Sequence, residues 1–154
     1  MAVRADEISS IIRKRIDEFD KDIGRVILPQ HDSEAIKWMD YIPQETMFWR
    51  RRVWDRLGGL DRQFQYAMDW DFILRAHAEG FKFYRLPRFL GCFRVYAGQK
   101  TSSQIETGNA ESALLRMRYL GRTVSPREQN DAIRAYLRRH VLTVRAYKLR
   151  FVRY

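Results

Sequence analysis

Two carboxylates stand one residue apart in the middle of the chain, in the triplet Asp69-Trp70-Asp71. The residues that follow have the apolar spacing of a helix, which Gly80 is expected to end. Acids are stabilised at a helix N-terminus, because the unpaired N–H groups and the positive end of the helix dipole lie there. Both residues could therefore be helix caps. A carboxylate within reach of a hydroxyl can also act as a general base, so the triplet is equally a candidate catalytic motif.

Further motifs surround this triplet in a characteristic order. They are the run YIPQETMFWR at residues 41–50, the glycine pair at 58–59, AMDWD at 67–71, LGCFRV at 90–95 and KT at 100–101. In order and spacing, residues 23–150 resemble the C-terminal half of a family-2 (GT-A type) glycosyltransferase. This resemblance implies transfer of a sugar from a nucleotide-sugar donor to an acceptor hydroxyl.

The resemblance also assigns roles to individual residues. Asp69 matches the catalytic base, which takes the proton of the acceptor hydroxyl as that oxygen attacks the anomeric carbon. Asp71 would support the start of the helix behind the base, while Trp70 and Gln44 would lie on the acceptor side. Although the triplet is also an Asp-x-Asp pattern of the metal-binding kind, its place after the glycine pair matches the base motif instead.

The donor diphosphate needs positive charge beside it, and the resemblance points to Arg94 and Lys100 for this purpose. It also implies a divalent metal, Mg²⁺ or Mn²⁺. The family has a histidine where this chain has Tyr96. A neutral phenol is a poor ligand for a divalent cation, so the resemblance gives this chain no assigned metal ligand.

Enzymes of this class bind the nucleotide-sugar with an N-terminal half of alternating strands and helices. Residues 1–40 are too few for that half, because each parallel crossover needs a dozen or more residues. We therefore expect the chain to be inactive without a complementary half or a second copy of itself. The acceptor class implied by the family is a polysaccharide or a glycolipid.

The first residues point in another direction. Residues 1–20 resemble the extreme N-terminus of the alpha subunit of F-type ATP synthases, which forms a helix that docks on the peripheral stalk. Ile8, Ile11, Ile12, Ile16 and Phe19 have helical spacing, so an amphipathic helix is expected over residues 6–19. No phosphate-binding Gly-x-x-x-x-Gly-Lys motif follows. An alternative function is thus a non-catalytic scaffold that docks through this helix.

Positive charge is concentrated at the other end of the chain. The formal net charge is +10, and residues 116–154 alone contribute +9. Such a segment suits an anionic membrane surface or RNA, and a third candidate function is binding of one of these. This third candidate ranks last, since no nucleic-acid motif is present. With no apolar stretch of membrane-spanning length, we expect a cytoplasmic location, peripheral at the inner face of the membrane.

These patterns together predict an α/β fold, a partial GT-A-like domain with a small mixed sheet, packed helices and two C-terminal helices. Three organisational units are expected: the N-terminal helix at 1–22, the transferase-like region at 23–103 and a basic helical extension at 104–154. Strands are predicted at 41–49, 81–86 and 88–96, and helices at 33–39, 50–57, 103–120 and from Ser125 onward.

Overall fold

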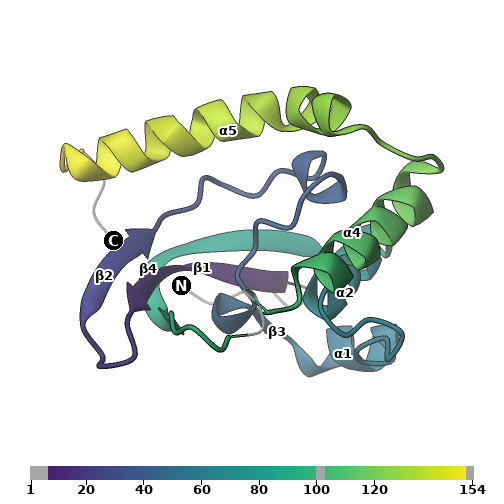
Figure 1. Ribbon diagram of the computed structural model, residues 1–154, viewed down its shortest axis with the longest axis horizontal. Helices are drawn as coiled ribbons and strands as arrows, with labels where there is room; N and C mark the ends of the chain where they lie inside the picture. Colours follow the sequence, from purple (N-terminus) through teal and green to yellow (C-terminus); the bar gives the residue numbers. More distant parts are fainter. Residues whose placement is uncertain (1–6, 100–102, 152–154) are drawn as a thin grey trace.

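The computed structural model describes residues 7–99 and 103–151. It confirms an α/β fold with a small mixed sheet and two long C-terminal helices, as Figure 1 shows. The elements in chain order are β1 (Glu7–Ile16), β2 (Asp22–Val26), the 3₁₀ turns η1 (Ala35–Lys37) and η2 (Gln44–Thr46), β3 (Phe48–Trp49), α1 (Arg51–Leu57), α2 (Met68–Ala78), β4 (Lys82–Arg94), α4 (Ile105–Leu120) and α5 (Pro126–Lys148).

The N-terminal segment is the central strand of the sheet, so the helix predicted over residues 6–19 is wrong. β1 pairs in parallel with β4 along its whole length. On its other edge it pairs with β3 near its start and with β2 near its end, both antiparallel. The spacing of its four isoleucines fits a helix or a strand, but β-branched side chains favour extended backbone. Pairing with other strands along both edges then makes the segment a strand.

β4 is one strand, where two strands separated by Pro87 were predicted. Leu86 and Phe89 pair with the consecutive residues Ile11 and Ile12, so the register shift absorbs the two residues between them. A proline has no N–H to donate to the neighbouring strand, and a residue in a bulge does not need to make that hydrogen bond. The strand therefore passes the proline without ending.

Gly91 permits a close approach of β4 to η2, as its sequence context suggested. A Cβ at this position would lie 2.8 Å from Thr46 Cγ2 and 3.0 Å from the Glu45 carbonyl oxygen. Residues 41–49 were predicted as a buried strand, and this is wrong for most of the segment. η2 occupies its middle, and only Phe48 and Trp49 are extended in the sheet. Pro43 fixes the backbone at the start of that turn.

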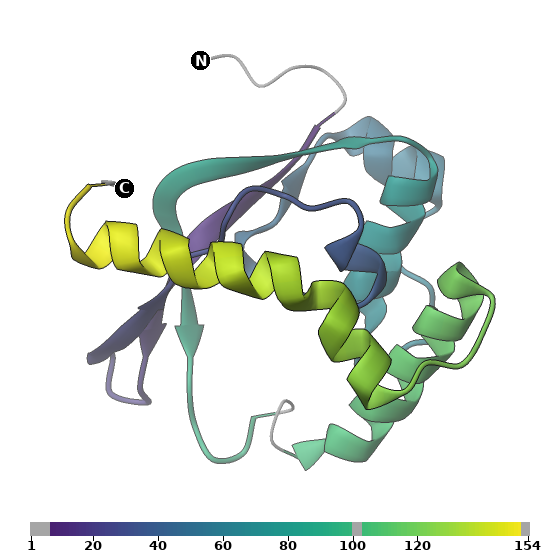
Figure 2. The ribbon, with the colours of Figure 1, turned by 90° about the horizontal axis from the view of Figure 1, so that it is seen from above.

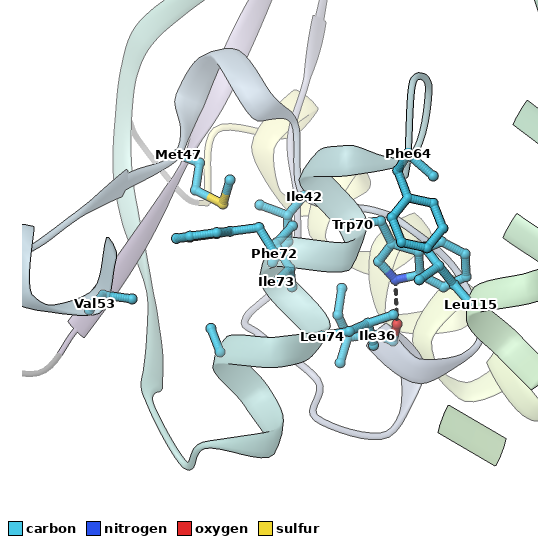
Figure 3. Packing of buried hydrophobic residues seen from close by; sticks show 12 residues of the cluster. Ile36, Ile42, Met47, Val53, Phe64, Trp70, Phe72, Ile73, Leu74 and Leu115 are labelled. Atoms are coloured by element: carbon cyan, nitrogen blue, oxygen red, sulfur yellow. Dashed lines mark hydrogen bonds between the residues drawn. The ribbon is translucent and has the colours of Figure 1, made fainter. Parts of the chain in front are cut away.

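The main hydrophobic core surrounds α2, and Figure 3 shows its packing. Trp70, Phe72, Ile73 and Leu74 from this helix are almost completely buried. The Trp70 indole N–H donates to the Ile36 carbonyl oxygen at 2.8 Å, so the ring is fixed by both packing and a hydrogen bond. The helix ends predicted before Gly58 and Gly80 are confirmed. α1 ends at Gly58, and the chain turns at Gly80 after α2, both glycines having positive φ.

Helix starts were predicted with mixed success. Ser125 caps α5 through a 3.3 Å bond from the Glu128 N–H, with Pro126 in the first turn, as expected. The helix predicted over 103–120 is found as α4, which begins at Ile105 without a side-chain cap. The helix predicted over 33–39 is reduced to η1, whose first N–H groups are bound by Asp32 rather than Ser33.

α5 lies across one face of the sheet, while α1, α2 and α4 gather at the far end of the strands (Figures 1 and 2). Val144 and Tyr147 of α5 pack against Ile27, Leu86 and Phe89 in a second, smaller cluster. The segment that follows β2 passes close to α5 through η1. Within the described residues, no helix is both long and apolar enough to cross a bilayer.

Candidate functional site

A pocket of about 620 Å³ opens where five elements converge. The start of α2, the η1–η2 segment, α5, α4 and the sheet each contribute to its wall. Its polar lining residues are Arg13, Asp40, Gln44, Glu45, Asp69, Ser112 and His140, and its aromatic ones are Tyr41, Tyr66, Trp70, Phe93 and Tyr136. A concave site with aromatic walls and a few convergent polar groups is the usual form of a small-molecule site.

Asp69 lies at this pocket in the first turn of α2. It is half-buried, and its Oδ1 accepts the Trp70 N–H at 2.9 Å. This contact gives the capping interpretation some support, because it engages an N–H of the first turn. It does not remove Asp69 from the pocket, so the same carboxylate can serve the helix and a ligand.

The turn that delivers Asp69 is held by Glu111 of α4. One carboxylate accepts the backbone N–H groups of Gln65, Tyr66 and Ala67, each at 2.8 Å. Three charge-assisted bonds to consecutive N–H groups fix the path of the chain immediately before α2. Gly108 completes the contact, because a Cβ there would lie 2.8 Å from the Tyr66 ring.

Asp40 is the second carboxylate that matters in the pocket. Much of its surface is accessible, yet the surrounding walls desolvate the carboxyl, and the charge of Asp69 adds to this effect. Both causes raise the pKa of Asp40 well above its ordinary value of 3.8, against the opposing bond from the Ile42 N–H. A raised pKa makes Asp40 easier to protonate than an ordinary aspartate, and the protonated carboxyl can donate a hydrogen bond.

The opposite wall carries an ion pair and the predicted glutamine. Arg13 binds Glu45 and lies 4.3 Å from the centre of the Phe93 ring. Gln44 is exposed beside them in η2. Because this amide can donate and accept, and the ion pair is already satisfied, the wall offers neutral hydrogen bonding rather than net charge.

α5 contributes Tyr136 and His140. The Tyr136 side chain is buried, its hydroxyl has no hydrogen-bond partner among the described residues, and its ring lies 4.4 Å from that of Tyr41. Burial, with the nearby charge of Asp40, raises the pKa of Tyr136. Burial also lowers the pKa of His140, so both side chains are neutral near pH 7.

Asp71 does not belong to the pocket. Its side chain is completely buried and accepts from Arg75 Nε at 2.7 Å and from Arg118 Nη1 at 3.4 Å. Arg75 continues to the carbonyl oxygens of Leu57 and Gly59. The second acid of the triplet is thus a structural link between α2, α4 and the turn after α1, which agrees with its predicted support of the helix.

Of the two proposed donor-phosphate residues, Arg94 does not line the pocket. It binds Asp20 at 2.6 Å and the carbonyl oxygens of Asp17 and Glu18, at the turn between β1 and β2. Arg94 is therefore engaged away from Asp69. Lys100 lies outside the described residues. Cys92, the single cysteine, is exposed.

The implied divalent metal does not fit the residues described. No group of three or more His, Cys, Asp and Glu side chains is arranged to hold an ion within residues 7–99 and 103–151. Tyr96, in the place of the family's histidine, is exposed. The chemistry derived below therefore uses only side chains of the pocket.

Comparison with known proteins adds no family to this description: no family model and no curated protein matches the chain. The glycosyltransferase and ATP-synthase resemblances thus stand on their motifs alone. Sequence patterns identified Asp69, Trp70 and Gln44, which meet at one pocket, but missed Asp40, Glu111 and Tyr136. None of these three stands in a motif that the sequence analysis singled out.

Proposed function

We propose that this chain is the acceptor-binding side of a glycosyltransferase of the family-2, GT-A type, with Asp69 as the base. One observation carries the proposal. Asp69 and Gln44, assigned from separate motifs, line the same pocket, which Asp40 also lines. Asp71, which the same motifs placed behind the base, lies there as a buried support.

In the proposed reaction an acceptor hydroxyl enters the pocket and donates a hydrogen bond to Asp69. Asp69 takes the proton as the hydroxyl oxygen forms a bond to the anomeric carbon of the donor. The bond from that carbon to the nucleoside diphosphate breaks, and the diphosphate leaves with the electron pair. The raised pKa of Asp40 favours its protonated form, which can donate a hydrogen bond to a neighbouring acceptor oxygen.

The ligand expected in this pocket is neutral and rich in hydroxyls. Aromatic side chains supply flat apolar surface, while Gln44, Ser112 and the Asp40–Asp69 pair supply hydrogen-bonding groups. A sugar ring presents both kinds of surface. The donor would have to be held by a complementary half or by a second copy, because positive charge for a diphosphate is not gathered at the pocket.

The scaffold alternative loses its main argument. It relied on an N-terminal amphipathic helix, and residues 7–16 instead form a strand paired on both edges. A segment held in the sheet along both edges does not form the helix on which that docking depended. The basic C-terminal segment lines the pocket through Tyr136 and His140, while its exposed arginines are considered separately below.

A nitrogen–proton NMR titration tests the proposal. Neutral mono- and oligosaccharides are added to the labelled chain, followed by UDP-, GDP- and dTDP-sugars with magnesium. We expect a saccharide to shift the Trp70 indole and the amides of 67–71, and Asp69→Asn to weaken that response. Glu106→Gln, an exposed acid on α4, is the matched control and should bind normally. A folded chain that ignores every saccharide and every donor would refute the assignment.

A further inference from the structure

The outward face of α5 is a long basic surface. Arg127, Arg134, Arg138 and Arg145 follow one another at steps of seven, four and seven residues, which places them on one side of a helix. All four are exposed. The inward face is equally well defined, because Ile133 and Tyr136 are buried toward the rest of the fold, and Figure 1 shows α5 as the outermost layer.

Apolar side chains are interleaved with these arginines. Leu142, Leu149 and Phe151 are 62%, 66% and 82% exposed, and none belongs to either hydrophobic cluster of the described residues. Leaving three large apolar groups in water along one helix costs free energy that burial would recover. They lie toward the C-terminal end of α5, where Lys148 and Arg150 add further charge.

Most of the positive charge on this face is left without an ion pair among the described residues. From residue 132 onward the sequence has no Asp or Glu. Arg134 is paired with Asp131 and Arg139 with Asp32, and no ion pair engages Arg138 or Arg145 among the described residues. The second half of α5 is therefore strongly positive and carries exposed apolar groups on the same side.

We propose that this outward face of α5, with the turn that follows it, docks on an anionic membrane surface. Arginine with leucine and phenylalanine on one exposed helix is the pattern of an interfacial helix, in which cations contact lipid headgroups while apolar side chains enter the acyl boundary. RNA would satisfy the charge alone. It offers no apolar medium for Leu142 and Leu149, and only Phe151 among the three exposed apolar side chains named above could stack on a base.

The surface is independent of the pocket. Tyr136 and His140 face the pocket from the same helix that presents Arg138 and Arg145 outward. If α5 docks, the pocket therefore lies beside the membrane. The side chains that contact the membrane are not the ones that line the pocket. The proposal stands even if the pocket binds no sugar.

Vesicle binding by the full chain tests this inference. Co-sedimentation is measured with phosphatidylcholine vesicles and with vesicles containing phosphatidylglycerol at a physiological fraction of anionic lipid. We expect binding to the anionic vesicles only, weakened by salt. The double variant R138E/R145E should lose at least about tenfold in affinity, since each basic residue at such a surface contributes several-fold. The charge-matched variant R62E/K82E alters exposed residues away from α5 and should bind like the parent.

Two further readouts separate insertion from simple charge attraction. Leu149→Trp places an indole at the apolar position, and its emission should shift to the blue on anionic vesicles. Circular dichroism confirms that each variant remains folded. Equal loss of binding in both double variants, an indole that stays in water, or tighter binding to single-stranded RNA than to anionic vesicles would each overturn the proposal.

Discussion

The same substitution at the two acids of the Asp69-Trp70-Asp71 triplet should change the stability of the fold by very different amounts. Asp71→Asn removes the charge that compensates Arg75 and Arg118, whereas Asp69→Asn removes a charge at the edge of a solvent-filled pocket. The chemical change is identical and the positions are two residues apart. Any difference in stability therefore reports the surroundings of each carboxylate.

The magnitude follows from burial. The Asp71 side chain has no exposed surface and Arg75 retains only 22%. Breaking a buried ion pair from one side costs about 3–5 kcal/mol, because the remaining charge stays desolvated. The asparagine oxygen still accepts one hydrogen bond, and Arg75 keeps its bonds to two carbonyl oxygens, so we expect about 2–3 kcal/mol. Asp69→Asn should lie within about 0.5 kcal/mol of the parent.

Urea denaturation followed by tryptophan fluorescence measures both values, with Trp70 as a core reporter. Thermal melting gives a second estimate, and a loss of 2–3 kcal/mol corresponds to about 4–12 °C in a chain of this size. Asp55→Asn on α1, whose side chain is exposed, controls for the loss of a surface ion pair and should cost at most about 0.5 kcal/mol. A parent-like Asp71→Asn, or an Asp69→Asn as unstable as it, would refute the division of roles.

Three further outcomes follow from the structure. Glu111→Gln should cost about 1–3 kcal/mol and broaden the amide signals of residues 65–69 in NMR spectra, since one amide oxygen cannot replace a carboxylate that accepts three N–H groups; Glu106→Gln on the same helix should do neither. Gly91→Ala should cost about 1–3 kcal/mol in urea denaturation, because its Cβ would clash with Thr46 and the Glu45 carbonyl, while Gly98→Ala, with only the Tyr96 ring 3.7 Å away, should be near neutral. Asp40 is protonated more readily in the folded chain than in the unfolded one, so the parent should lose stability as pH rises above 3.8 toward the raised pKa. Asp40→Asn should therefore be more stable than the parent at pH 8 but not at pH 3.5. A gain in stability that does not depend on pH would contradict the raised pKa of Asp40.

Local signals predicted the helices well, and non-local pairing caused the errors. Gly58 and Ser125 mark helix ends through their own backbone and side-chain preferences, which a short window contains. The spacing of Ile8, Ile11 and Ile12 suits a helix in such a window, but their strand partners on β4 lie about 75 residues away. The spacing of apolar residues in a short window carries no information about a partner so far away, and pairing in the sheet determines the conformation.

The residues of the candidate site also differ in whether a local sequence motif could reveal them. Asp69 and Gln44 could be found because each stands in a local motif. Glu111 could not, since an acid in the middle of an expected helix gives no sign of the turn it binds, 44 residues before it at Ala67. Asp40 ends a polar loop and has no special neighbour in sequence. Its importance arises only where the fold brings it beside Asp69.

The pairing of β1 with β4 has a consequence for how the chain is made. Residues 7–16 leave the ribosome before β4 and can form a hairpin with β2, but their other edge stays open until residue 94 has been synthesised. At about 5–20 residues per second this interval lasts roughly 4–15 s. During it an isoleucine-rich strand is a template for any other extended chain. Slow translation or crowding of nascent chains should therefore reduce the yield of folded protein more than loss of the last helix would.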